Sequence, residues 1–248
     1  MLRLGVALAV ALWVGEAVAK QACVAGDGAV IARACFTDQG GPVGYDHKIL
    51  GHTPEWTGLA FYPGPDGKAQ GLRPWGASFD HGFFEDIVPR LADVDGDGLA
   101  EIIAVHTDLD KGARLVVLST DQRLLAATAF IGQTRRWLAP AGVGDFDGDQ
   151  RVEIAYIDRP HLAKVLVLVR YEAGRLVELG RYPDFTNHRI GDAVISGGLR
   201  QCNGRDSLVL ADADWQRVVE VFFRNGILQQ IDRGAAMPGA MAAAMTCR

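Results

Sequence analysis

Two short acidic segments carry the residue types and spacing best suited to binding a metal ion. In the first, Asp93, Asp95, Asp97 and Glu101 place carboxylates at positions 1, 3, 5 and 9 of a loop, and the same pattern recurs from Asp145 onward. Alternate oxygens on a tight loop can surround one hard cation, and Ca²⁺ takes six to eight oxygen ligands. A solvated acidic turn is the alternative. The recurrence of the pattern favours calcium, because four carboxylates this close repel one another without a cation.

We expect each loop to bind one ion, which makes about two Ca²⁺ ions in total. The backbone carbonyl at position 7 would join the carboxylates. The predicted ligands are Asp93, Asp95, Asp97, Leu99 and Glu101 in the first loop, and Asp145, Asp147, Asp149, Arg151 and Glu153 in the second. Gln150 stands where the first loop has a glycine, so we expect the second loop to be strained or weaker. An EF-hand is excluded, because it needs Glu at position 12, where these loops have Ala104 and Tyr156.

A second repeated element pairs an Asp or Asn with a histidine. It occurs as Asp46-His47, Asp80-His81 and Asn187-His188, and Arg136 holds the comparable place in another unit. We expect His47, His81, Arg136 and His188 to gather at one polar face, at the opposite end of the strands from the acidic loops. Such a face could bind a transition metal or an anion, or perform acid–base catalysis. The alternative is structural, with the pairs capping strand ends through hydrogen bonds.

A repeat of about 52 residues positions these elements. Apolar runs at 113–119 and 123–131 follow the first acidic loop, and runs at 163–171 and 176–181 follow the second. A weaker copy ends in two runs joined by Asn225-Gly226, a strong hairpin signal. Four short strands per unit are typical of propeller blades. We therefore predict an all-β fold, a small β-propeller of four four-stranded blades or five smaller ones, with a β-sandwich as the alternative. The predicted repeats span about 36–88, 89–141, 142–194 and 195–248.

The acidic loops and the strands that flank them resemble the FG-GAP (VCBS-type) repeats of integrin α-subunit propellers and of many exported bacterial proteins. The resemblance covers residues 89–183 well and 195–231 weakly. It implies a propeller with calcium in the turn between the first two strands of a blade. The third copy keeps Asp206 but has Gly198, Arg200 and Cys202 at ligand positions, so we expect no ion there. Integrin propellers have seven blades, for which this chain is too short.

The N-terminus and the cysteines indicate an exported protein. Arg3, an apolar run and Ala17-Val18-Ala19 form a signal-peptide pattern over 1–19, which leaves a single domain over 20–248. This apolar run is too short to cross a membrane as a helix, and no second apolar span follows it. The four cysteines, an even number, predict two disulfides. Spacing favours Cys23 with Cys35 and Cys202 with Cys247, and pairings that join the two chain ends remain open. We therefore expect a secreted or periplasmic location.

Charge and motifs narrow the function classes. The net charge of −5 provides no basic surface for nucleic acid. Nucleophile elbows, phosphate loops and zinc-protease motifs do not occur in the sequence, so we name no catalytic residue. The favoured function is a calcium-binding module that recognises a protein or carbohydrate ligand. The alternative is an exported hydrolase or lyase that uses the histidine face.

Overall fold

The computed structural model describes residues 22–28, 30–42, 44–65 and 75–247. This part of the chain consists of short strands and loops with a single five-residue helix, α1 (Ala240–Ala244). Every strand pairing recorded there is antiparallel. The predicted all-β class is therefore confirmed. The predicted signal peptide, 1–19, lies outside the described residues. In the described part, no helix is sufficiently long and apolar to cross a bilayer.

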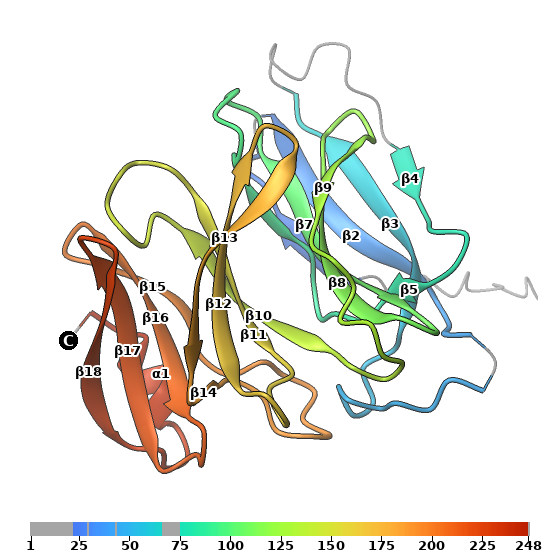
Figure 1. Ribbon diagram of the computed structural model, residues 1–248. Coiled ribbons are helices and arrows are strands. Elements are labelled where there is room, and N and C mark those ends of the chain that lie inside the picture. Colours follow the sequence, from blue (N-terminus) through green and yellow to red (C-terminus); the bar gives the residue numbers. More distant parts are fainter. Residues whose placement is uncertain (1–21, 29, 43, 66–74, 248) are drawn as a thin grey trace, which may run out of the picture.

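The strands form three sheets that lie side by side like a fan (Figure 1). The first sheet contains β1 (Ala22–Ala25), β2 (Ile31–Gln39), β3 (Trp56–Pro63), β4 (Trp75–Ala77), β5 (Phe83–Phe84), β6 (Arg90–Ala92), β7 (Glu101–Asp108), β8 (Gly112–Leu118) and β9 (Leu124–Ala127). The second contains β10 (Leu138–Gly144), β11 (Glu153–Asp158), β12 (Val165–Glu172) and β13 (Arg175–Pro183). The third contains β14 (Phe185–Thr186), β15 (Gly198–Cys202), β16 (Arg205–Asp212), β17 (Arg217–Arg224) and β18 (Ile227–Ala235).

Successive strands pair with their neighbours in sequence, as the repeat predicts. The order β10-β11-β12-β13 is a simple meander, and β15 to β18 repeat it. The turn at Asn225-Gly226 joins β17 to β18, and both residues have positive φ, 53° and 72°. A two-residue turn with two positive φ angles matches the right-handed twist of the strands that it joins. The strands of the weakest repeat copy thus form at the predicted positions.

The first two units depart from the expectation of separate sheets. The two-residue strand β5 pairs with β3 through Phe84 and Trp56, and with β7 through Phe83 and Thr107. This link merges β1–β4 and β6–β9 into one nine-stranded sheet. Phe83 and Phe84 are both buried, so the link is part of the core.

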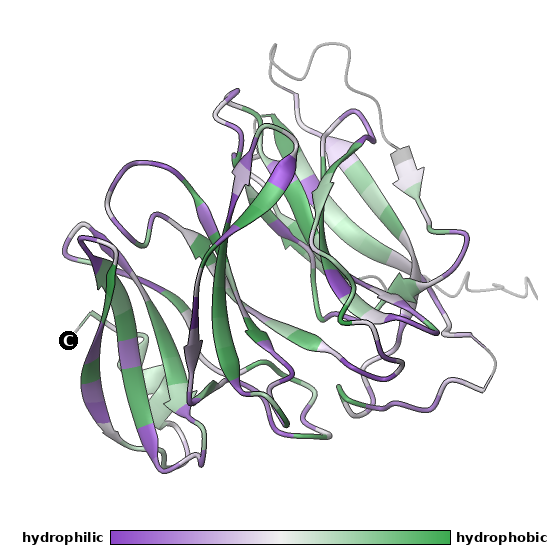
Figure 2. Cartoon of the chain, in the orientation of Figure 1, coloured by the Kyte–Doolittle hydropathy of each residue, from purple (hydrophilic) through white to green (hydrophobic). Residues whose placement is uncertain are grey.

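The hairpin of β7 and β8 is buried on both faces. Ile103, Val105 and Leu115 pack toward the second and third sheets, in one apolar cluster. Residues of opposite parity, among them Ile102 and Ala104, pack against β2 and β3 in another. Successive side chains of a strand point to opposite faces, so a strand between two neighbours must be apolar throughout. Figure 2 shows the contrast with β18, an outer strand that is largely hydrophilic and exposed.

The first and last units of the chain touch. The amide of Gly191 donates to the carbonyl of Ile49 at 3.1 Å. A cavity of about 440 Å³ is lined by residues of β1, β6, β10 and β15, the first strand of each of the four units. Two disulfides stabilise the units at the ends of the described chain. Cys23 pairs with Cys35, and Cys202 pairs with Cys247, which is the connectivity that spacing favoured.

Candidate functional site

The first acidic loop connects β6 to β7 and is folded by its own carboxylates. Asp93 accepts hydrogen bonds from the amides of Gly96 and Gly98, at 2.7 and 2.9 Å. Glu101, the first residue of β7, reaches back to accept the amide of Val94 at 2.9 Å. One carboxylate oxygen each from Asp93, Asp95 and Glu101 lies within 4.8 Å of the others, close enough for one metal ion. Asp97 is not in this group; it is exposed and accepts the amide of Leu99.

The second loop, between β10 and β11, repeats this geometry bond for bond. Asp145 accepts the amides of Gly148 and Gln150, at 2.7 and 2.9 Å, and Glu153 accepts the amide of Phe146 at 2.8 Å. Oxygens of Asp145, Asp147 and Glu153 again lie within 4.8 Å of one another. The amide of Arg151 donates to the exposed Asp149, as that of Leu99 does to Asp97. The predicted positions 1, 3 and 9 thus come together in both loops.

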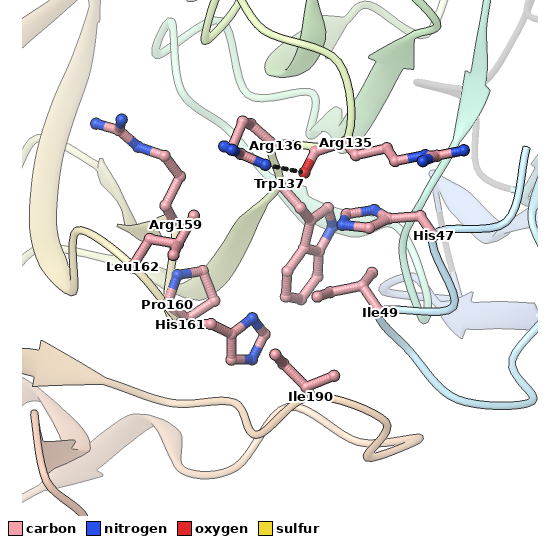
Figure 3. A pocket seen from close by; sticks show the side chains of 10 residues that line it. All are labelled: His47, Ile49, Arg135, Arg136, Trp137, Arg159, Pro160, His161, Leu162 and Ile190. Atoms are coloured by element: carbon pink, nitrogen blue, oxygen red, sulfur yellow. Dashed lines mark hydrogen bonds between the residues drawn. The ribbon is translucent and has the colours of Figure 1, made fainter.

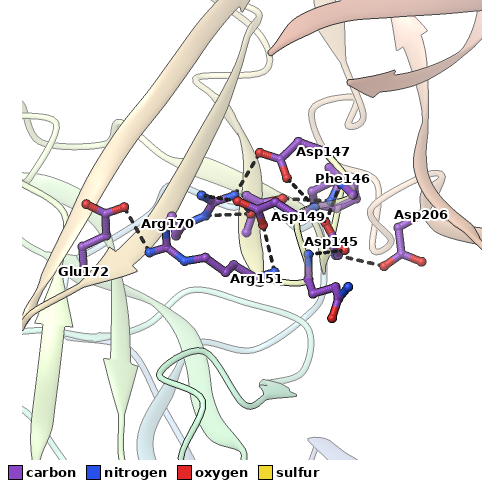
Figure 4. Close-up of polar contacts among 11 residues, drawn as sticks. Asp145, Phe146, Asp147, Asp149, Arg151, Arg170, Glu172 and Asp206 are labelled. Atoms are coloured by element: carbon purple, nitrogen blue, oxygen red, sulfur yellow. Dashed lines mark hydrogen bonds and ion pairs between the residues drawn. The ribbon is translucent and has the colours of Figure 1, made fainter. Parts of the chain in front are cut away.

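The two loops differ in the charge beside them. Arg170 on β12 extends its guanidinium into the second loop and contacts Asp147 and Asp149, each at 2.9 Å, and also Glu153 (Figure 4). Arg170 is 7% exposed and Glu153 is fully buried, so this ion pair is shielded from solvent. No basic side chain of the described residues forms an ion pair with a carboxylate of the first loop. Arg170 pairs with Glu153 across β11 and β12. The corresponding residue opposite Glu101 is Ser119, which directly follows β8.

This difference appears in the acidity of the two glutamates. Burial, the hydrogen bond from Val94, which opposes it, and the negative charges of Asp95, Asp97 and Asp93 together raise the pKa of Glu101 to about 7. Burial also raises the pKa of Glu153, but there the hydrogen bond and charge of Arg170 oppose the shift. The first loop therefore holds excess negative charge that a cation would relieve.

The last unit, β15–β18, has a tight hairpin at the place where the two preceding units have acidic loops. β15 and β16 are joined directly at Asn203-Gly204, and Arg200 extends from β15 to the buried Glu220 on β17 at 3.0 Å. Asp206, the acidic residue that this copy retains, instead accepts the amide of Asp145 at 3.0 Å. It therefore supports the second loop rather than forming a metal-binding group of its own.

A pocket of about 190 Å³ lies at the other end of β10 and β11. Its walls come from residues just before β10, including Arg136 and Trp137, and just after β11, including His161. His47 and Ile49 reach it from the first unit (Figure 3). His47 is oriented by the buried Glu85, with Nδ1 2.8 Å from a carboxylate oxygen.

The structure brings together only part of the predicted histidine face. His47 and Arg136 line the pocket. His188 is fully buried behind it, where Nε2 donates to the carbonyl of Asp192 at 2.8 Å and Nδ1 lies 3.1 Å from Nε2 of His161. His81 is exposed and does not line the pocket; its neighbour Gly82 lies against His106, on the first sheet.

Burial and charge keep the inner histidines neutral. Burial, and to a smaller extent electrostatic repulsion from His188 and His47, lower the pKa of His161 to about 4. Burial likewise lowers the pKa of His188. At neutral pH these two imidazoles are therefore hydrogen-bonding groups and not cations.

Sequence reasoning missed two residues that matter at these sites. His161 lines the pocket without an adjacent Asp or Asn, so the paired motif could not reveal it. Arg170 is the other, and its signal is a basic residue at the end of the strand that pairs with the second loop's glutamate.

Comparison with known proteins supports the reading of the acidic loops. A family model for the FG-GAP-like repeat matches residues 93–156, which contain both loops and the strands between them. A search of curated proteins found no match. These residues therefore form an FG-GAP-like repeat, as the two acidic loops predicted.

Proposed function

We propose that this chain is an exported, calcium-stabilised β-propeller that acts as a ligand-binding or protein-interaction module. Its four blades would be β1–β4, β6–β9, β10–β13 and β15–β18. The FG-GAP-like repeat supports this architecture, as does the cavity that the four first strands share. The contact between Gly191 and Ile49 joins the first and last blades in this arrangement.

Export is supported by chemistry of the described residues. Two disulfides, Cys23–Cys35 and Cys202–Cys247, persist in oxidising compartments and are rare in the reducing cytosol. Together with the signal-peptide pattern over 1–19, they favour a secreted or periplasmic location. The partner of the module would be a protein or a carbohydrate.

One observation carries the calcium proposal. In the first loop, oxygens of Asp93, Asp95 and Glu101 converge within 4.8 Å, and no basic side chain of the described residues pairs with them. Hard carboxylate oxygens suit Ca²⁺, and the carbonyl of Leu99 and water would complete six or more ligands. Both glycines of this loop have the positive φ that the wrap requires, 80° at Gly96 and 86° at Gly98.

We propose that the second loop binds calcium less tightly. Arg170 already forms ion pairs with Asp147, Asp149 and Glu153, so an ion must displace a buried guanidinium before it can bind. Charge inside a poorly solvated site is strongly disfavoured unless it is paired, which makes the resident ion pair costly to break. Calcium would in this case be structural and concentrated in the first loop.

Calorimetric titration of the calcium-free protein tests this proposal. We expect binding with a Kd of about 0.1–1 mM, the range of extracellular calcium modules. Asp95→Asn should abolish the heat of this binding, because it removes a charged ligand at nearly constant volume. Asp121→Asn is the matched control, since Asp121 is an exposed acid paired with Arg123 and lies outside both loops. Absence of calcium binding by the wild-type protein at about 10 mM calcium, at least tenfold above the expected Kd, would refute the proposal.

An exported hydrolase or lyase is the second candidate, and one arrangement favours it. Glu85 is 3% exposed and accepts from His47, Tyr45 and Thr107, which holds the imidazole against the pocket. A carboxylate-oriented imidazole is a common general base. Turnover of ester or glycoside substrates that His47→Gln abolishes would establish this function. Equal background rates for both proteins would leave the binding module as the function.

A further inference from the structure

The pocket beside Trp137 combines free positive charge with apolar surface. Three arginines, Arg135, Arg136 and Arg159, are among the residues that line a cavity of about 190 Å³ (Figure 3). Arg159 is engaged, since it donates to Asp158 at 2.8 and 3.0 Å. Neither Arg135 nor Arg136 forms an ion pair with any described carboxylate. In a protein with a net charge of −5, two unpaired guanidiniums at one cavity point to an anionic ligand.

The nearby carboxylates already have other hydrogen-bonding partners. Glu85 behind the pocket wall accepts from His47 at 2.8 Å and from Thr107 at 3.0 Å. Asp158 is shared between Arg159 and Arg181. Among the described residues, the Arg136 side chain donates one hydrogen bond, to the carbonyl of Arg135 at 3.2 Å. Its other N–H donors are left for a ligand.

Several other residues of the cavity wall are apolar. Trp137 is 2% exposed, and its indole N–H donates to the carbonyl of Glu85 at 2.8 Å, which fixes the ring. Leu162 and Ile190 line the same cavity, yet they are 64% and 70% exposed. A single exposed aliphatic side chain is ordinary, but two at the rim of one cavity leave apolar surface that a ligand could cover. Pockets of this composition bind molecules with an apolar body and one polar group.

We infer that this cavity binds a small carboxylate with an apolar body, its carboxylate held by Arg136 and its body against Trp137, Leu162 and Ile190. Arginine suits this role because its planar fork donates two parallel hydrogen bonds to a carboxylate. His161 adds a neutral hydrogen-bonding group, held in place by His188 at 3.1 Å. This inference rests on the proposed role as a ligand-binding module and names its ligand class. The site is separate from the second acidic loop, which joins the other ends of β10 and β11, and no residue of the first loop, between β6 and β7, lines it.

Calorimetric titration with three probes tests the ligand class. We expect benzoate to bind with a Kd of about 1 mM or tighter, an affinity reasonable for so small a ligand. Benzamide has the same shape without the charge, and acetate has the charge without the body. Each should bind at least tenfold more weakly than benzoate. Equal affinities for benzoate and benzamide would overturn the assignment of the charge, and equal affinities for benzoate and acetate would overturn that of the apolar wall.

Variants of the protein locate the site. Arg136→Gln should weaken benzoate binding at least tenfold, whereas Arg224→Gln, at an exposed hairpin tip, should leave it unchanged. Arg135→Gln, at an exposed position, provides a second test if Arg136→Gln fails to fold. Wild-type affinity in both pocket variants would refute the inference.

A calcium-site variant separates this inference from the proposed function. Asp95→Asn should retain wild-type affinity for benzoate, because no residue of the first acidic loop lines the pocket. Loss of calcium binding with retained benzoate binding would then concern the loop alone. Loss of benzoate binding in Asp95→Asn, with the fold intact, would contradict a separate pocket.

Discussion

The two acidic loops have nearly the same sequence and the same backbone hydrogen bonds, yet among the described residues only the second has a basic side chain paired with its carboxylates. In the second loop Arg170 supplies it from the neighbouring strand, at 2.9 Å from both Asp147 and Asp149. The first loop has Ser119 at that place, and burial raises the pKa of Glu101 to about 7. The loop motif therefore specifies how the carboxylates converge. The residue on the neighbouring strand decides whether a guanidinium already pairs with them, as Arg170 does, or whether they are left for the proposed calcium ion.

Removing Arg170 should have the largest effect on this comparison. Arg170→Leu would leave the fully buried Glu153 without its partner, and breaking a buried pair in this way costs about 3–5 kcal/mol. We expect this loss in the free energy of unfolding, measured by urea denaturation in calcium-free buffer. Calcium should then restore more stability to the variant than it adds to the wild-type protein.

Ser119→Ala is the matched change beside the first acidic loop. It removes a hydroxyl that bonds to Asp121 and to Arg123, so we expect a loss of about 1 kcal/mol. If Arg170→Leu were no more destabilising than Ser119→Ala, the second loop would not depend on its guanidinium.

The pH dependence of stability should distinguish the two glutamates next. Glu101 in the calcium-free protein keeps its proton up to a pKa of about 7, well above the usual value of 4.5. The folded state then binds more protons than the unfolded state, so this carboxyl stabilises the fold below pH 4.5 and the contribution is lost as the pH rises to about 7. Glu101→Gln should remove that decline, measured as the difference in melting temperature from the wild-type protein between pH 4.5 and 7.

A second buried group, His106, titrates in the same pH range, and Glu153→Gln serves as a control. His106 has a pKa lowered to about 4 by burial and by the charge of Arg114, so its contribution is lost as the pH falls from 6.5 to 4. It is the same in both proteins and cancels in the difference. Glu153→Gln should instead destabilise throughout this range, because it weakens the pair with Arg170. Parallel pH profiles for wild type and Glu101→Gln would show that Glu101 ionises normally.

The stabilisation by calcium should also differ between the two loops, by less than the loss of stability expected for Arg170→Leu. If the first loop binds with a Kd of about 0.1 mM, then about 1 mM free calcium adds roughly 1.5 kcal/mol. That corresponds to a rise of about 3–6 °C in Tm for a protein of this size. Asp95→Asn should abolish the rise, whereas Asp147→Asn should retain most of it. Equal losses in the two variants would mean that both loops bind calcium alike.

The sequence predicted the strands well where apolar runs were long. The run at 113–119 corresponds to β8 (Gly112–Leu118), and the run at 163–171 to β12 (Val165–Glu172). It did not predict that β5 joins the first two units. A strand of two residues has no periodicity to recognise, and its pairing depends on the contacts of Phe83 and Phe84 with the core.

The candidate sites could be predicted only as far as local spacing reaches. Within each loop, positions 1, 3 and 9 converge because they lie on one tight turn. The position of Arg170 depends on strand register: it follows Glu153 by 17 residues, whereas Ser119 follows Glu101 by 18. An alignment of the two units without gaps therefore matches Ser119 with Tyr171 and not with Arg170, the residue that pairs with Glu153. The predicted histidine face was only partly assembled for a similar reason, because His81 belongs to the segment that the β5 link holds elsewhere.

The smallest expected difference between the loops lies in one backbone position. Gly98 has φ of 86° and Gln150, its counterpart, has φ of 68°. A residue with a Cβ pays about 1 kcal/mol to adopt this left-handed conformation. A Cβ at Gly98 would meet no atom within 4 Å, so the cost of a larger residue there is conformational rather than steric. Gly98→Gln should therefore destabilise the calcium-free protein by about 1 kcal/mol. Gln150→Gly should stabilise by less, because glycine also makes the unfolded chain more flexible. Urea denaturation of both reciprocal variants measures these changes. A loss on Gln150→Gly would show that its side chain makes contacts worth more than the strain.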